Sequence, residues 1–361
     1  MKILILSNLV SYTYNFRKEI IDALIDKGHE IVIACDNDSP EKQAELEKTC
    51  TLINVPFNGK GKKLKEEMAL IRTYSSLMDS QKPDAVFTFT IKMNLYGGFA
   101  SCRKKVPFFP MITGLGELEK PGKLQKMLLL MHKYVMPKAK CIFFQNKANM
   151  EFFQSHGIKV RKSVLVPGSG VNLEKFIYKD YPSEDLPTEV AFIGRVTEAK
   201  GISEYLDVAE QLCALVVFHV AGLCDEKFRP RIEDLQNRGV IVYHGSLEDT
   251  RPLLEKISCL VLPTYHPEGM SNVLLEAGAT GRPAICTDRP GCSDIIKNGV
   301  NGLYCLPRDP GNLRSVLESF LSTDYERRRQ MGIEARKVVE KSFDRQIVVD
   351  AYLKEVGTLN D

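Results

Sequence analysis

The 361-residue sequence lacks the features of several broad protein classes. No stretch approaches the roughly 18 to 20 apolar residues that a helix needs to cross a bilayer, and MKILILSN at the start is too short for a signal peptide. Ten cysteines are present, but no pair has CxxC spacing, and several lie in apolar runs such as KCIFF (140–144) and SCLVL (258–262). We therefore expect a protein made and kept inside the cell, with reduced and mostly buried thiols.

Acidic residues are scarce in one stretch of an otherwise balanced chain. Overall, 49 Lys and Arg stand against 46 Asp and Glu, but between Ala85 and Met150 the only acids are Glu117 and Glu119. That stretch contains eleven basic residues: Lys92, Arg103, Lys104, Lys105, Lys120, Lys123, Lys126, Lys133, Lys138, Lys140 and Lys147. A field of this sign concentrates anionic partners such as phosphates, acidic lipids or nucleic acid.

The chain has no low-complexity tract or short-period repeat, and its dominant pattern is alternation. Apolar strands alternate with amphipathic helices, which indicates parallel sheets covered by helices on both faces. Expected strands of the first half are 2–7, 30–35, 84–89, 107–112, 141–146 and 163–168. Those of the second half are 189–195, 215–222, 240–245, 259–264 and 283–288.

The weakest part of this pattern lies between the halves. NLEKFIYKDYPSEDLPTE (172–189) is charged, carries two prolines and indicates a linker. We predict an N-terminal Rossmann-like domain over 1–173, a linker over 174–188 and a second Rossmann-like domain over 189–338. The final stretch, 339–361, belongs to a long helical region and is expected to cross back to the N-terminal domain. The predicted fold class is α/β, two doubly wound domains facing across a cleft, with ligands at the carboxyl ends of the strands.

PEGMSNVLLEAG (267–278) places two glutamates around the start of a helix. Glu268 lies in a bend, Ser271 is a candidate N-cap, and Asn272 begins the helix that carries Glu276. Free N–H groups at such a helix end suit phosphate, and the two carboxylates are placed to accept hydrogen bonds from sugar hydroxyls. The alternative interpretation makes Glu268 a solvated loop acid and Glu276 a partner of the helix dipole.

A second motif, GRVTEAKG (194–201), follows an expected buried strand. Arg195 and Lys200 lie there between glycines, where two fixed cations would hold a diphosphate. The alternative is an ordinary charged loop. CDND (35–38) contains a D-x-D, the metal motif of a different transferase fold, and we interpret it as a turn at the end of a strand.

The two motifs together resemble the retaining glycosyltransferases of the GT-B fold in family 4, which includes sucrose and glycogen synthases. The resemblance extends over VAG (220–222), HGSLED (244–249), NGVNGL (298–303) and GSGVNLEKF (168–176). In the first half, YNFR (14–17), FTFTIKMNLYG (87–97), ITGLGE (112–117) and IFFQN (142–146) are similar to the branch that extends lipid-linked saccharides for capsule, O-antigen and N-glycan assembly.

The resemblance implies roles for individual residues. Glu276 corresponds to the acid that holds the nucleotide ribose, Glu268 to one near the donor sugar's hydroxyls, and Arg195 and Lys200 to the pair that neutralises the diphosphate. Glu268, Arg195 and Lys200 are the implied catalytic residues. Backbone N–H groups of Gly269, Met270 and Ser271 would bind the distal phosphate. Gly194 and Asn272 complete the predicted donor site, and His266 is a candidate to line it because it lies near Glu268 in the sequence. Many relatives have Phe-Pro or Tyr-Gly in place of Met270-Ser271, and a histidine that some use near the sugar has no clear counterpart.

In the first half, we expect polar residues on loops after strands to bind the acceptor. These are Asn8, Asn15, Arg17, Lys92, Asn94 and Gly114. Lys92 and Arg17 are the candidates for the acceptor's diphosphate.

GKLQKMLLLMHKYVM (122–136) has an amphipathic pattern. At 100° per residue, one face holds Leu124, Met127, Leu128, Met131, Tyr134 and Val135, and another holds Lys123, Lys126 and Lys133. The pattern is typical of a helix lying on an anionic membrane, and the alternative is a helix docked on the core with a solvated lysine edge.

The predicted function is a metal-independent, retaining glycosyl transfer. A sugar, either an N-acetylhexosamine or a hexose, would pass from a UDP-sugar to an undecaprenyl-diphosphate-linked saccharide, with no further cofactor, at the inner face of the plasma membrane. A UDP-sugar 2-epimerase of the same architecture is one alternative, but the sequence offers no separate acid/base pair for it. A basic nucleic-acid-binding protein is another, and it leaves the Arg/Lys and Glu/Glu motifs unexplained.

Overall fold

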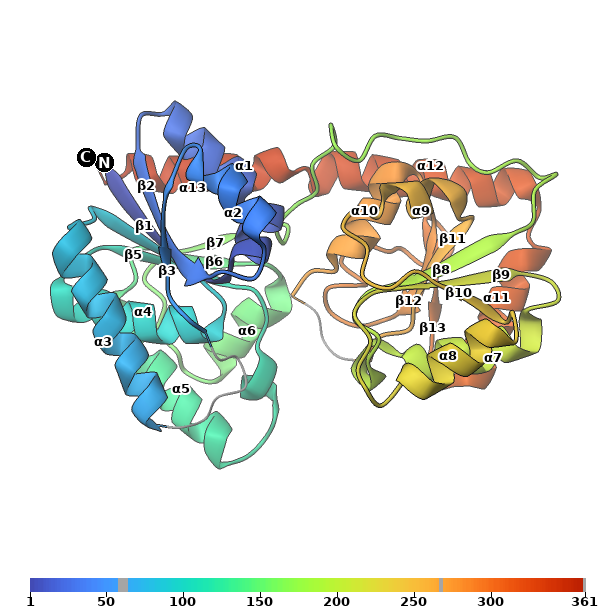
Figure 1. Cartoon of the computed structure of the whole chain (residues 1–361), viewed down its shortest axis with the longest axis horizontal. Helices are drawn as coiled ribbons and strands as arrows, with labels where there is room; N and C mark the ends of the chain where they lie inside the picture. Colours follow the sequence, from blue (N-terminus) through green and yellow to red (C-terminus); the bar gives the residue numbers. More distant parts are fainter. Residues whose placement is uncertain (58–63, 266–268, 360–361) are drawn as a thin grey trace. The chain divides into compact units, whose positions relative to one another are not determined.

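The structure is a computed structural model that describes residues 1–57, 64–265 and 269–359 (Figure 1). The chain forms two compact units. Unit 1 comprises residues 1–169 and 345–361, and unit 2 comprises residues 170–344.

Unit 1 contains a parallel sheet which, over the described residues, has seven strands in the order β3-β2-β1-β4-β5-β6-β7. The strands are β1 (Lys2–Leu9), β2 (Glu30–Asp36), β3 (Thr51–Asn54), β4 (Ala85–Phe89), β5 (Phe108–Ile112), β6 (Ile142–Phe144) and β7 (Ser163–Leu165). The helices are α1 (Val10–Asp26), α2 (Pro40–Glu47), α3 (Leu64–Gln81), α4 (Ile91–Lys104), α5 (Lys123–Val135), α6 (Lys147–Ser155) and α13 (Arg345–Gly357), with 3-10 turns η1 (Gly116–Glu119) and η2 (Met136–Lys138).

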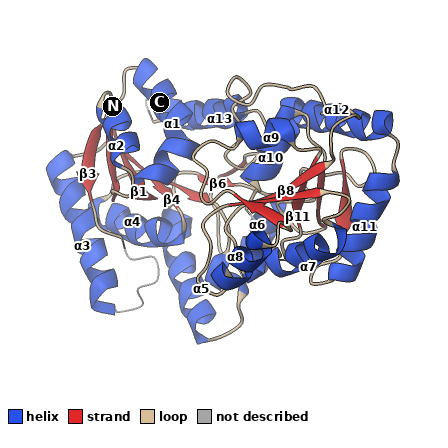
Figure 2. Ribbon diagram, turned by 45° about the vertical axis from the view of Figure 1, so that its right-hand side comes forward, coloured by secondary structure: helices blue, strands red, loops and turns tan. Residues whose placement is uncertain are grey.

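Unit 2 repeats this plan with a parallel sheet in the order β10-β9-β8-β11-β12-β13. Its strands are β8 (Glu189–Ile193), β9 (Val217–Ala221), β10 (Ile241–Tyr243), β11 (Cys259–Leu262), β12 (Ala284–Thr287) and β13 (Gly302–Cys305). Its helices are α7 (Ile202–Leu212), α8 (Arg229–Asn237), α9 (Arg251–Lys256), α10 (Asn272–Thr280), α11 (Pro310–Ser322) and α12 (Tyr325–Ser342), with a 3-10 turn η3 (Glu198–Lys200). In both units helices lie on both faces of the sheet (Figure 2).

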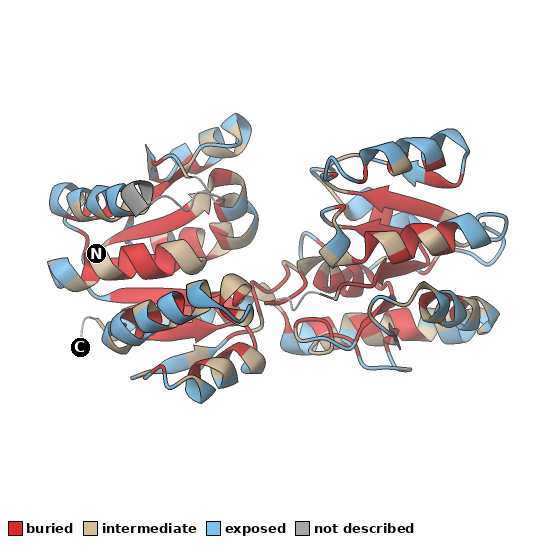
Figure 3. Cartoon of the chain, turned by 90° about the horizontal axis from the view of Figure 1, so that it is seen from below, coloured by how far each residue is buried: buried red, intermediate tan, exposed pale blue. Residues whose placement is uncertain are grey.

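The continuous apolar strands follow from burial on both faces. Along β1, Leu4 and Leu6 belong to one hydrophobic cluster, while Ile3 and Ile5 belong to another on the opposite face. In each unit the buried strands lie between helices whose outer faces are exposed (Figure 3). The predicted α/β, doubly wound fold class is confirmed.

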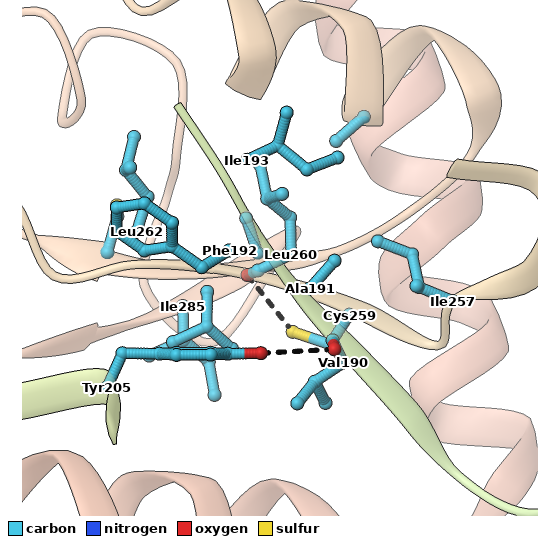
Figure 4. Packing of buried hydrophobic residues seen from close by; sticks show 14 of the residues in the cluster. Val190, Ala191, Phe192, Ile193, Tyr205, Ile257, Cys259, Leu260, Leu262 and Ile285 are labelled. Carbon is cyan, nitrogen blue, oxygen red and sulfur yellow. Dashed lines mark hydrogen bonds between the residues drawn. The ribbon is translucent and has the colours of Figure 1, made fainter. Parts of the chain in front are cut away.

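In unit 2 the packing of α7 on the sheet includes a satisfied polar group (Figure 4). Tyr205 is buried against Phe192, with ring centroids 5.6 Å apart. Its hydroxyl donates to the carbonyl oxygens of Val190 at 3.1 Å and His219 at 2.8 Å. These bonds tie α7 to two adjacent strands, and therefore fix the helix that follows the GRVTEAKG loop.

Each sheet has one point where the direction of strand succession reverses, between β1 and β4 in unit 1 and between β8 and β11 in unit 2. Loops at the carboxyl ends of such strands diverge and leave room for a ligand. The GRVTEAKG motif follows β8, and PEGMSNVLLEAG follows β11, so both donor motifs lie at the reversal point of unit 2.

The segment interpreted as a linker, 174–188, belongs to unit 2. The buried Arg282 donates to the backbone oxygens of Lys179 and Asp180, and Arg336 donates to that of Phe176. The charge and proline content of this segment do not predict its attachment to unit 2, because the attachment is made through main-chain oxygens.

The long C-terminal helical region is two helices. It is interrupted at Phe343, whose ring is buried and whose carbonyl oxygen accepts from Val171 N at 2.9 Å. Unit 2 ends there, and α13 belongs to unit 1. The short strands β3 and β13, four residues each, were not predicted, because neither forms an apolar run of ordinary strand length.

Candidate functional site

The loop after β8 is fixed by its backbone. Gly194 N donates to Ala221 O at 2.9 Å, and Val196 N donates to Leu223 O at 2.9 Å. Gly222 has φ +141°, and a Cβ there would lie 1.9 Å from Gly194 O, so only glycine permits this approach. The loop carrying Arg195 is therefore held against the end of β9.

The other end of this loop is joined to the end of β11. Ala199 O accepts from Tyr265 N at 3.2 Å and from Thr264 Oγ1 at 3.1 Å. Gly201 has φ +79°, and a Cβ there would lie 2.2 Å from Pro263 O. Lys200, half-buried, thus lies beside the segment that leads toward α10.

Arg195 differs from Lys200 in its exposure. Its side chain is exposed, and within the described ranges its guanidinium forms no hydrogen bond or ion pair. A cation on a fixed main chain with its donors directed to solvent suits an anionic ligand, because little conformational freedom is lost on binding.

The start of α10 agrees only in part with the prediction. Ser271 occupies the N-cap position, but its hydroxyl does not cap the helix, and its N–H donates to Gly291 O at 3.1 Å. That donor is used within unit 2, so the predicted contact of the Ser271 N–H with phosphate would need this hydrogen bond to break. Gly269 and Met270 are buried, and the Met270 side chain belongs to the core. Oδ1 of Asn272 is buried and has no hydrogen-bond partner among the described residues, as expected of a group whose partner is a ligand or water.

Glu276 is held in place by a residue that the sequence did not single out. Thr250, at the N-cap position of α9, donates from Oγ1 to Glu276 Oε2 at 2.9 Å. Behind Glu276, α10 packs closely on α12, where a Cβ on Gly278 would lie 2.8 Å from Val339 Cγ2. The carboxylate is thus oriented by a hydroxyl and a fixed helix. Glu268 and His266 lie outside the described residues.

Most of the predicted acceptor residues are not on loops. Asn8 lies in β1, Asn15 and Arg17 in α1, and Lys92 and Asn94 in α4, because α1 and α4 begin within one residue of the strands that precede them. Gly114 lies in the loop after β5.

Two of these residues are buried structural groups. The Asn94 amide accepts from Thr88 Oγ1 at 2.7 Å and donates to Met111 O at 2.8 Å, which leaves little capacity for an acceptor. Arg17 stacks on Phe89 at 4.4 Å and donates to Ser169 Oγ at 2.9 Å. Burial lowers the pKa of Arg17 to about 10. The predicted direct acceptor contacts of Asn94 and Arg17 do not fit this burial.

Lys92 lines a cavity of about 490 Å³ at the carboxyl ends of β2 and β3. Its ammonium forms an ion pair with Glu67 at 2.7 Å and lies 5.7 Å from the centroid of the Phe57 ring. Asp36, from the CDND motif, also lines this cavity, and its Oδ2 accepts from Phe57 N at 3.0 Å. Carboxylates and an ammonium offer hydrogen bonds to hydroxyl groups, and an aromatic ring offers an apolar face. Glu67 and Phe57 were not predicted, because no motif marks them.

Known proteins share both the sequence patterns and this architecture. Residues 2–146 match the family described as "Glycosyl transferase 4-like", and residues 187–323 match "Glycosyl transferases group 1". Sucrose-phosphate synthase from Thermosynechococcus elongatus superposes with a TM-score of 0.83 at 16% identity, covering 99% of each chain. The chain belongs to the GT-B glycosyltransferases.

Two further proteins are similar to this glycosyltransferase over nearly its whole length. It is 26% identical to an N,N'-diacetylbacillosaminyl-diphospho-undecaprenol alpha-1,3-N-acetylgalactosaminyltransferase of Campylobacter jejuni, covering 98% of each chain. Anabaena Alr3699/HepE in complex with UDP-glucose superposes with a TM-score of 0.78 at 15% identity, covering 99% of this chain and 100% of that one.

The basic helix of the glycosyltransferase, α5, does not have the predicted faces. Leu128, His132 and Val135 are buried, but Met127 and Tyr134, expected on the apolar face, are 50% and 54% exposed. Leu130 is 68% exposed, so apolar side chains lie among Lys123, Lys126 and Lys133 on the solvent side. The error arises because unit 1 covers only the part of the helix surface that holds Leu128, His132 and Val135. No helix in the described ranges is long and apolar enough to cross a membrane.

Proposed function

We propose that this glycosyltransferase transfers a sugar from a UDP-sugar to a polyprenyl-diphosphate-linked saccharide, with retention of configuration and without a metal ion. The observation that carries the proposal is the loop after β8, fixed by the Gly194–Gly222 approach, with the exposed Arg195 and the nearby Lys200. Two cations on such a loop suit a diphosphate leaving group.

Unit 2 supplies groups for each part of the donor. Arg195 and Lys200 would neutralise charge on the departing UDP, and Glu276, oriented by Thr250, would accept hydrogen bonds from the ribose hydroxyls. Asn272 Oδ1, which has no hydrogen-bond partner among the described residues, is a further polar atom available to the donor. The complex of the structural neighbour with UDP-glucose supports a UDP-sugar as donor.

The chemical step follows from these charges. The bond between the anomeric carbon and the diphosphate oxygen breaks, and positive charge develops on the sugar while negative charge develops on UDP. The acceptor hydroxyl forms the new bond from the same face and passes its proton to the departing diphosphate oxygen. The protein's contribution is to stabilise the leaving group rather than to form a covalent intermediate.

Unit 1 would bind the acceptor. The cavity at Lys92 offers an ammonium, the Glu67 and Asp36 carboxylates and the Phe57 ring, which suit hydroxyls and the apolar face of a sugar. The Campylobacter relative, whose name specifies an undecaprenol-linked acceptor, supports a lipid-linked saccharide. A role in surface polysaccharide or glycan assembly follows from that acceptor class.

A peripheral position on the inner face of the plasma membrane completes the proposal. It is supported by the basic, partly apolar outer face of α5, at which Lys123, Lys126 and Lys133 would contact anionic lipid. Replacing these three lysines with glutamine should weaken sedimentation with anionic vesicles, and undiminished binding would count against this position.

The decisive experiment is a panel of UDP-sugars incubated with and without a polyprenyl-diphosphate saccharide, with UDP release as the readout. We expect release from one or a few donors only when acceptor is present, unaffected by EDTA. The product's anomeric configuration, determined by NMR coupling, tests retention. UDP release or sugar isomerisation without acceptor would favour an epimerase and contradict the proposal.

A further inference from the structure

Unit 1 has a second cavity, of about 450 Å³, at the amino ends of β5, β6 and β7. This is the opposite edge of the sheet from the cavity at Lys92. Four basic side chains line it: Lys105, Lys138, Lys140 and Arg161. No carboxylate lies among the described residues that line it.

The charge in this cavity is not neutralised by neighbouring acids. Asp79 already pairs with Lys104 at 2.5 Å, and Glu355 pairs with Lys162 at 2.8 Å. Over the described part of the chain, none of the four cations forms an ion pair of its own. Four like charges around one concave surface repel each other and create a positive potential that an anion would relieve.

Lys105 occupies a strained backbone position at this cavity. It is the C-cap of α4 with φ +59°, in the left-handed region where glycine is the usual residue. A lysine there is less stable than glycine, so Lys105→Gly removes the positive charge without a cost in stability.

The cavity adjoins the exposed apolar side chains of α5. Lys138, which lines the cavity, places its ammonium 3.2 Å from the centroid of the Tyr134 ring. That ring stacks on Phe99 at 5.3 Å, and Cys102, one turn further along α4, also lines the cavity. Leu130 lies one turn from Tyr134 and is 68% exposed. A soluble phosphate would make no contact with this apolar surface, whereas a phospholipid presents both a phosphate and acyl chains.

We propose that this cavity binds the phosphate of an anionic phospholipid headgroup while Leu130 and Tyr134 contact the boundary between headgroups and acyl chains. The inference rests on the membrane position included in the proposed function. It adds a defined headgroup site at the opposite end of α5 from Lys123.

The first test measures flotation of the full chain with phosphatidylcholine vesicles containing phosphatidylglycerol. Lys105→Gly should weaken binding about fivefold, the effect of one lysine at an anionic surface. Lys82→Gly is the matched control, because Lys82 also follows a helix in unit 1, has φ +48° and is exposed, but does not line the cavity. Both variants should melt at or above the wild-type temperature, so unfolding would not explain a loss. Equal losses in the two variants would overturn the proposal, because binding would then depend on total charge alone.

The second test separates a lipid from a soluble anion. Leu130→Ser, a change at an exposed side chain, should weaken flotation while leaving binding of inorganic phosphate unchanged. If Lys105→Gly loses phosphate binding but floats as well as the wild type, the cavity is a soluble-anion site and the lipid assignment is wrong. Flotation needs neither donor nor acceptor. The lipid-site proposal can therefore fail in flotation while the UDP-release assay supports the proposed activity, and it can hold when that assay fails.

Discussion

The two units have the same strand succession around their reversal points but place polar side chains differently there. In unit 2, glycines bring backbone segments together, and the cation Arg195 remains exposed on the resulting loop. In unit 1, Arg17 and Asn94 next to the reversal point are buried and satisfied by protein groups. The same topology thus offers one unit whose strand-end loop suits a charged diphosphate and another whose binding groups lie in a cavity and on helix surfaces. Position in the topology indicates the strand ends at which a ligand is expected, whereas burial decides which residues a ligand can reach.

The largest expected effect concerns α13, the helix that completes the core of unit 1. Tyr352 of α13 stacks on Phe143 with ring centroids 4.0 Å apart and also contacts Phe87 at 5.2 Å. Tyr352→Ala should lower the free energy of unfolding of unit 1 by about 3–5 kcal/mol, the cost of deleting a buried aromatic ring. Amide hydrogen exchange should show the loss in unit 1 and not in unit 2. Tyr12→Ala, at an exposed ring, is the control, and comparable losses in the two variants would contradict the role of α13.

The next effect concerns the exposed cation of unit 2. Arg195→Ala should lower turnover by roughly 10²–10³-fold, the loss expected for one group that stabilises charge in the transition state. Steady-state UDP release measures it. Arg229→Ala, in α8 of the same unit, is a control for the removal of one positive charge. Near-wild-type turnover in Arg195→Ala would contradict the proposal that Arg195 stabilises the leaving group.

Low pH should destabilise unit 1 more than unit 2. Burial lowers the pKa of His132 in unit 1 to about 4, whereas an unfolded histidine titrates near 6.5. As the pH falls from about 6.5 to about 4, the unfolded chain takes up a proton that native His132 does not. Unit 1 should therefore lose up to about 3 kcal/mol of stability over that range and none above it.

The buried histidine of unit 2 that compares with His132 is His219. Burial also lowers the pKa of His219, but Glu189, 2.6 Å from its Nε2, opposes that shift. Urea unfolding at several pH values, read by hydrogen exchange, should show the steeper acid loss in unit 1. His132→Leu should flatten that dependence, and an unchanged slope would assign the acid sensitivity to other groups.

A smaller effect is expected where the loop after β8 meets β9. In Gly222→Ala the new Cβ would displace Gly194, so we expect a cost of about 1–3 kcal/mol and reduced turnover as Arg195 moves. Gly239→Ala is the matched control, because Gly239 has φ +71° and a Cβ added there would have no described atom within 4 Å. If turnover falls equally in both variants, the close approach has no role in placing Arg195.

The smallest effect concerns the orientation of Glu276. Thr250→Ala removes one hydrogen bond to its carboxylate and should raise the KM for the donor about fivefold, as expected for roughly 1 kcal/mol. Thr250→Ser keeps the hydroxyl and should restore the wild-type value. An unchanged KM in Thr250→Ala would contradict the role of Glu276 in donor binding.

The sequence predicts the parallel sheets because their strands are buried on both faces and are therefore apolar throughout. It also predicts that Arg195 and Lys200 follow β8 and that Glu276 lies in the helix after β11, since glycine-flanked loops and a helix start are local patterns. It does not predict Thr250, whose contact with Glu276 spans 26 positions, or the cavity formed by Glu67 and Phe57. It misplaces Met127 and Tyr134 because periodicity defines the faces of a helix but not how much of its circumference the core covers.

The return of α13 to unit 1 also determines when unit 1 can be completed during synthesis. Unit 1 begins with the first residue and is completed only by residues 345–361, after all of unit 2 has left the ribosome. At about 5–20 residues per second, the intervening 170–344 take roughly 10 to 35 s to synthesise. During that interval the aromatic surface that will receive Tyr352 lacks its partner, so nascent chains should depend on chaperones more for their first half than for their second.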